Sequence, residues 1–218
     1  MEHSSNLQHH FDDLPQQFDS ATLGMWVFLL TEIMFFGGMF GAYSIYRSLY
    51  PEAFASTSKH MDTMLGAVNT AVLICSSLTM ALAVRSAQVG KQKMLIWMLV
   101  LTMFFGAIFL GVKAYEYHHK WVEHLIPGFG FEYPEDPQYF HQAQILFFLY
   151  FAMTGFHALH MVVGFGIMST LLVMAARGRF TPEWYTPVEI SGLYWHFVDI
   201  VWIFLFPLLY LIGLHAHK

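Results

Sequence analysis

Five long stretches of apolar residues, separated by short polar segments, dominate the chain. They cover about residues 22–46, 62–84, 94–115, 142–174 and 188–213. A helix needs roughly 20 apolar residues to cross the hydrocarbon core of a bilayer, so each stretch is long enough to span a membrane. None of them alternates apolar and polar positions as a membrane β-strand does. The pattern predicts an all-α, polytopic integral membrane protein, with a bundle of five transmembrane helices in a single membrane domain, 1–218.

The composition supports this prediction and excludes several classes of protein. Hydrophobic residues make up 56% of the 218 residues and charged residues 11%, against about 25% charged in soluble domains. The net charge of −5, with ten Lys and Arg residues, leaves no basic patch for nucleic acid. A single cysteine, Cys75, excludes an internal disulfide and a cysteine-ligated iron–sulfur cluster.

Positive charge sets the expected orientation in the membrane. With the N-terminus in the cytoplasm, five Lys and Arg residues fall on each side, but the two inner loops are shorter and more densely basic. The positive-inside rule then favours a cytoplasmic N-terminus and a periplasmic C-terminus. The inner residues are Arg85, Lys91, Lys93, Arg177 and Arg179, and the outer ones are Arg47, Lys59, Lys113, Lys120 and Lys218.

Glu32 lies within the first apolar stretch, with no basic residue within one helical turn. A charged residue at the centre of a transmembrane helix raises the free energy of membrane insertion by about 2.5–3.5 kcal/mol. Such a carboxyl therefore needs a bonding partner or has a functional role. It is therefore a proton-handling group, a structural anchor, or a neutral glutamate hydrogen-bonded for packing alone. We expect it to be buried and bonded to the fourth span through His157 or His160. If the first helix begins near Thr22, depth along the helices favours His160, whereas a start near Pro15 favours His157. We prefer His157, because residues 15–20 contain no other strong helix stop.

Two pairs of polar residues in the last two stretches share a spacing of three. His157 and His160 form one pair, and His196 and Asp199 form the other. Residues three apart lie on neighbouring positions of a helix surface. Imidazoles and carboxylates suit several metals, but no H-E-x-x-H motif, Glu-x-x-His pair or cysteine ligand accompanies them. We favour a polar network between helices over a haem or metal site.

Lys113 lies at the end of the third stretch and Glu116 directly after it, again three residues apart, and Tyr115 and Tyr117 flank Glu116. Tyrosines are enriched at the boundary between membrane and water. We therefore expect an interfacial ion pair between Lys113 and Glu116, anchored by these tyrosines.

Four segments resemble one known family, subunit III of the haem–copper oxidases, which includes cytochrome c oxidase subunit III. Gly24 to Phe36 (GMWVFLLTEIMFF) is similar to the family motif that holds a buried glutamate. Val112 to Tyr117 (VKAYEY) is similar to the end of a family helix. The two most specific segments are TGFHALHMVVG, residues 154–164, and YWHFVDIVWIF, residues 194–204. Mitochondrial-type members have seven spans, whereas this chain resembles the bacterial five-span form. This difference leaves open whether the family's V-shaped lipid cleft is complete within the chain.

The resemblance implies a subunit without catalytic residues or a redox centre of its own. Haem and copper belong to the partner subunits I and II, and a small subunit IV and a larger respiratory supercomplex are further expected partners. The family supports the proton-uptake side of subunit I, binds phospholipid and protects turnover from inactivation. Glu32 then corresponds to the family's carbodiimide-reactive carboxyl. His157, His160, His196 and Asp199 correspond to its structural and lipid-contacting partners.

Several functions stay open at this point. The implied complex is a proton-pumping oxidase of the bacterial inner membrane that reduces oxygen to water, with cytochrome c favoured over quinol as electron donor. A nitric oxide reductase accessory subunit is an alternative within the wider family. A stand-alone proton-coupled transporter that uses Glu32 as its carrier is an alternative of another class.

Overall fold

The computed structural model describes residues 7–57, 62–128, 130–131, 133 and 137–211. In this part of the chain, five helices are long and apolar enough to cross a membrane. They are α1 (Leu14–Leu49), α3 (Thr63–Gln88), α4 (Gln92–Val122), α5 (Phe140–Ala176) and α6 (Thr186–Tyr210). The short helix α2 (Pro51–Thr57) follows α1, and a 3₁₀ turn, η2 (Pro137–Tyr139), precedes α5. The predicted all-α bundle is confirmed.

Two helices extend well beyond the apolar stretches that predicted them. Helix α1 begins at Leu14, because the side chain of Asp13 caps it by accepting a hydrogen bond from the backbone N–H of Gln16 at 2.8 Å. Helix α4 continues to Val122, although the apolar stretch that predicted it ends at about residue 115. Hydropathy marks only the part of a helix that lies in lipid, whereas backbone hydrogen bonds continue into water. The predicted end of the fifth span, residue 213, lies outside the described residues.

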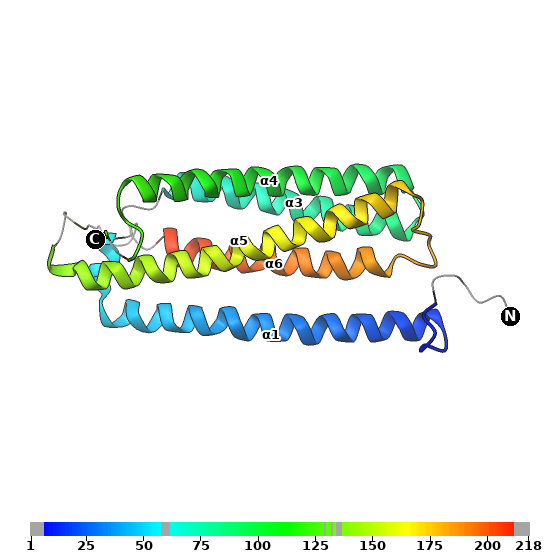
Figure 1. Ribbon diagram of the computed structural model, residues 1–218, viewed down its shortest axis with the longest axis horizontal. Helices are drawn as coiled ribbons and strands as arrows, with labels where there is room; N and C mark the ends of the chain where they lie inside the picture. Colours follow the sequence, from blue (N-terminus) through cyan, green and yellow to red (C-terminus); the bar gives the residue numbers. More distant parts are fainter. Residues whose placement is uncertain (1–6, 58–61, 129, 132, 134–136, 212–218) are drawn as a thin grey trace.

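The helices differ in how far the rest of the chain encloses them. Helices α3 and α4 lie side by side, α5 crosses the bundle, and α6 packs between its neighbours, whereas α1 lies along one side against α5 and α6 (Figure 1). In the most apolar 18-residue segment of α6, 56% of the residues are buried inside the bundle, compared with 11% in the corresponding segment of α1. Helix α6 is therefore the centre of the bundle, and α1 leaves most of its apolar surface for lipid or another subunit.

The centre of the bundle is built around Trp195, which is completely buried. Two glycines make room for its ring. A Cβ atom added at Gly164 of α5 would lie 2.7 Å from this ring, and one added at Gly106 of α4 would lie 3.1 Å from it. The indole N–H of Trp195 donates to the hydroxyl of Ser76 on α3 at 3.0 Å. One side chain of α6 thus fixes the approach of three other helices.

Candidate functional site

Glu32 of α1 contacts an imidazole of α5, which is the interhelical partner that its own helix does not provide. Nε2 of His160 lies 3.1 Å from Oε2 of Glu32, and the two side chains are 16% and 19% exposed. Glu32 is therefore half-buried rather than buried as we expected, because α1 lies at the side of the bundle. Nδ1 of His160 lies 2.8 Å from the carbonyl oxygen of Phe156. A carbonyl can only accept, so Nδ1 carries a proton. The pair therefore holds one shared proton, either on Glu32 with a neutral imidazole or on an imidazolium facing a carboxylate.

The preference for His157 as the partner of Glu32 is wrong. Helix α1 begins at the early position, near Pro15, that favoured His157, yet His160 makes the contact. The reason is rotation about the axis of α5. Three residues turn a helix through about 300°, so His157 and His160 point about 60° apart and face different neighbours.

His157 points into the centre of the bundle instead. Its ring lies 5.4 Å from that of Phe109 and 5.2 Å from that of Trp202, measured between centroids. The side chain is completely buried, and neither ring nitrogen has a hydrogen-bond partner among the described residues. In this structure His157 packs as an aromatic ring between α4 and α6.

His196 and Asp199 of α6 belong to a third site, which they form with α3. Nδ1 of His196 lies 2.7 Å from the hydroxyl oxygen of Ser77. Asp199 is 2% exposed. Among the described residues, no donor lies at both the distance and the angle of a hydrogen bond to either of its carboxylate oxygens. Ser77 also lies close enough to Asp199 to interact with it. The four predicted polar residues therefore lie in three separate places, with His196 and Asp199 together beside Ser77.

The candidate metal ligands of the last two spans lie too far apart to bind one ion together. Within the described ranges, no three His, Cys, Asp or Glu side chains come together as a possible metal site. His157 is enclosed by aromatic rings, His160 bonds to Glu32, and His196 bonds to Ser77. Each imidazole is thus held in a different direction by a different neighbour.

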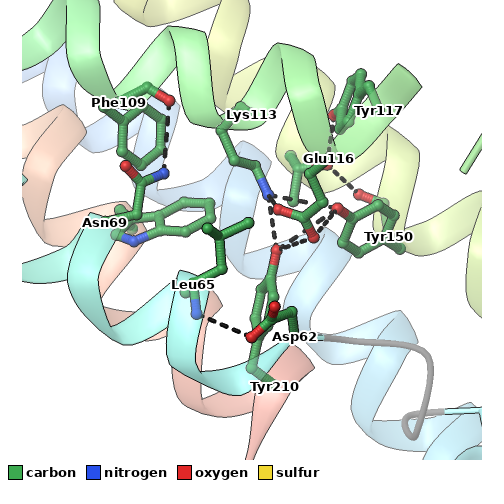
Figure 2. A network of polar contacts seen from close by, with 12 residues as sticks. Asp62, Leu65, Asn69, Phe109, Lys113, Glu116, Tyr117, Tyr150 and Tyr210 are labelled. Carbon is green, nitrogen blue, oxygen red and sulfur yellow. Dashed lines mark hydrogen bonds and ion pairs between the residues drawn. The ribbon is translucent and has the colours of Figure 1, made fainter. Parts of the chain in front are cut away.

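Lys113 and Glu116 form the predicted ion pair, with Nζ of Lys113 2.9 Å from Oε2 of Glu116. The pair lies inside the bundle rather than on its surface, because the two residues are 4% and 7% exposed. Figure 2 shows two tyrosine hydroxyls converging on it, from Tyr150 of α5 and Tyr210 of α6. They donate to Oε1 of Glu116 at 2.7 and 2.6 Å. Three helices are therefore tied together by one carboxylate.

The tyrosines that hold this pair are not the ones that the sequence indicated. Tyr115 is 66% exposed, and the hydroxyl of Tyr117 bonds to that of Thr154 at 2.5 Å. Tyr150 could have been found, because it lies one and two turns before Thr154 and His157 on the same face of α5. No local pattern indicates Tyr210, which comes from the far end of α6 and also accepts from Lys113 Nζ at 2.7 Å.

The comparisons with known proteins agree with this architecture. A model of the cytochrome c oxidase subunit III family matches residues 15–124 and 128–214. The chain belongs to the cytochrome c oxidase subunit III family. All four segments that carried the resemblance lie inside the matched ranges, so the family prediction is confirmed.

Similar members of the family serve two kinds of oxidase. Cytochrome c oxidase subunit 3 of Corynebacterium diphtheriae is 34% identical over 88% of both chains. The subunit of the same name from Thermostichus vulcanus is 31% identical over 89% of this chain and 88% of its own. Cytochrome bo(3) ubiquinol oxidase subunit 3 of Pseudomonas putida is 30% identical over 88% of this chain and 86% of its own. The family's complexes are haem–copper oxidases, so this chain is a multi-pass subunit of an oxidoreductase complex.

Proposed function

We propose that this chain is the non-catalytic subunit III of a proton-pumping haem–copper oxidase in a bacterial inner membrane. The family match over nearly the whole chain carries the proposal. In the proposed complex the haem and copper centres lie in partner subunits I and II, and this chain stabilises the complex. Cytochrome c is the proposed electron donor and quinol the alternative, since relatives of both kinds have similar identity.

The Glu32–His160 pair is the proposed proton-handling element of the subunit. It joins α1 to α5, and both side chains keep some exposure on the lightly covered α1 side of the bundle. A shared proton can move between carboxyl and imidazole without leaving either group unpartnered. Lys113 and Glu116 have the complementary, structural role, because the tyrosine hydroxyls already satisfy them.

Phospholipid is the proposed ligand of the groove between α1 and α6. This groove has a volume of about 460 Å³ and is lined almost entirely by apolar side chains. Trp26, Ile33 and Phe40 line it from α1, and Phe197 and Phe204 line it from α6. A long apolar groove on the side of a membrane helix fits an acyl chain. An acyl chain held here would support α1, which few other contacts hold in place.

Purification of a tagged chain in mild detergent tests the proposed function. We expect other subunits and haem to co-purify with the tagged chain, and the preparation to consume oxygen. The electron donor follows from whether reduced cytochrome c or a quinol sustains this rate. If the chain purifies alone and moves protons in liposomes, the transporter alternative is correct instead.

Orientation is tested on the same complex. Single cysteines placed before Asp13 and after Leu211, in a chain in which Cys75 is replaced by Ala, report the two sides of the membrane. A membrane-impermeant maleimide should label only the C-terminal position from the periplasmic side. Labelling of the N-terminal position from that side contradicts the proposed orientation.

A further inference from the structure

The groove between α3 and α6 contains a buried carboxyl group, that of Asp199, whose hydrogen-bonding capacity is not fully used within the described chain. It has a volume of about 340 Å³ and lies beside an exposed ridge of α6 formed by Ile200 and Ile203. Its lining is apolar except for Ser77, His196 and Asp199. Asp199 is 98% buried. Within the described chain, no donor lies at both the distance and the angle of a hydrogen bond to its two carboxylate oxygens.

The hydroxyl of Ser77 cannot satisfy this group by itself. It carries one proton, and it faces both Nδ1 of His196 and the carboxyl of Asp199. If Asp199 is protonated, it donates to Ser77, and its carbonyl oxygen has no donor. If Asp199 is ionised and Ser77 donates to His196, Asp199 receives nothing. If His196 donates to Ser77, the Ser77 proton reaches one oxygen of Asp199, and the other oxygen still lacks a donor. In each of these arrangements at least one oxygen of Asp199, enclosed just beneath the lining of the groove, remains an unused acceptor.

The depth of Asp199 decides what could supply the missing donor. Asp199 follows Thr186 by 13 residues and precedes Tyr210 by 11, which places it roughly 20 Å and 17 Å from the two helix ends at about 1.5 Å per residue. This position is near the middle of a hydrocarbon core about 30 Å thick. Lipid headgroups do not reach this depth, and acyl chains have no donor to offer.

We propose that the α3/α6 groove is the docking site for a transmembrane helix of a partner oxidase subunit. This helix presents a hydrogen-bond donor, such as a hydroxyl or amide side chain, to Asp199 at the middle of the membrane. The inference rests on the proposed function and specifies which face of the subunit meets its partner. Hydrogen bonds from hydroxyl and amide side chains are a common means of joining helices in membranes. The groove accepts the body of the partner helix, and the ridge of Ile200 and Ile203 packs beside it.

Filling the groove tests the proposal in the tagged complex without touching the polar groups. Ala81 lines the groove and is exposed in this chain, so Ala81→Phe blocks the groove while the chain still folds. Ala107→Phe on α4 is the matched control, because Ala107 is also exposed but lies outside the groove. We expect Ala81→Phe to lower the haem that co-purifies with the chain about tenfold, and Ala107→Phe to change it less than about twofold. Equal haem with both variants overturns the proposal.

Two further measurements address the hydrogen bond and the location. Asp199→Leu should lower co-purified haem about tenfold, whereas Asp199→Asn, which keeps an acceptor, should stay within about threefold of wild type. A photo-crosslinking residue at Ile203 should form an adduct with another oxidase subunit, and one at Phe104 of α4 should not. Adducts of Ile203 with lipid alone, or with a second copy of this chain, overturn the proposal.

The amount of haem that co-purifies with the wild-type chain distinguishes a failure of the proposed function from a failure of the proposed docking face. If the wild-type chain purifies without haem, the proposed function itself is wrong. If wild type carries haem and the groove variants do too, the function stands and only the docking face is wrong.

Discussion

Removing one member of the buried Lys113–Glu116 pair should destabilise the bundle more than removing both. Glu116→Leu leaves the ammonium group of Lys113, which is 4% exposed, with only two tyrosine oxygens as partners. Lys113→Met leaves the carboxylate of Glu116 without its counter-ion. Breaking a buried pair from one side costs about 3–5 kcal/mol. We expect each single variant to lower the free energy of unfolding by this amount.

The double variant Lys113→Met/Glu116→Leu removes both charges together. The hydroxyls of Tyr150 and Tyr210 lie 3.5 Å apart, so they can bond to each other once the carboxylate is gone. We therefore expect the double variant to cost about 2–3 kcal/mol less than the sum of the two single variants. Tyr210→Phe alone should cost about 1–3 kcal/mol, because it removes one donor to Glu116 and one acceptor for Lys113.

Unfolding in mixed micelles, with a rising fraction of sodium dodecyl sulfate and tryptophan fluorescence as the readout, measures these differences. Tyr115→Phe is the matched control, because Tyr115 is 66% exposed and should change the stability by less than about 0.5 kcal/mol. Single variants that each cost less than about 1 kcal/mol, or costs that simply add in the double variant, would refute the coupling inferred from the geometry.

Four further predictions concern Glu32, Gly164 and the metal content of the chain. Glu32→Gln should keep the fold but abolish carbodiimide labelling, measured by mass spectrometry of the labelled chain. Glu32→Leu should weaken assembly, since it leaves Nε2 of His160 without its partner, and normal yield of the complex would contradict this. Gly164→Ala should lower the thermal midpoint of the purified complex, because its Cβ would lie 2.7 Å from the ring of Trp195, whereas Gly166→Ala, with open space around it, should not. Elemental analysis of the isolated chain should find no stoichiometric metal or haem iron. Metal bound by its histidines would contradict the interpretation that these residues make polar contacts between helices.

The helices could be predicted from the sequence because the bilayer imposes their length. Each apolar stretch must satisfy its backbone groups internally, and only a helix does so within one segment. The helix ends were less predictable. The start of α1 depends on the cap made by Asp13, and α4 continues past Glu116, where hydropathy no longer marks it.

The contacts of the polar residues differ in whether the sequence could predict them. Lys113 and Glu116 lie one turn apart on a single helix, so their pairing follows from local geometry and the sequence indicated it. The choice of His160 over His157, by contrast, depends on how α5 is rotated against α1. Spacing along one helix contains no information about that rotation.

The sequence by itself determined the class of protein, the number of spans, the family and which polar residues lie in the membrane. These follow from composition and from short segments of chain, where each residue's neighbours are known. Only the tertiary structure decided that Tyr210 completes the Lys113–Glu116 site and that Ser77 contacts His196. Those partners are 94 and 119 residues apart in the chain, and the packing of large and small side chains, such as Trp195 against Gly164, brings their helices together.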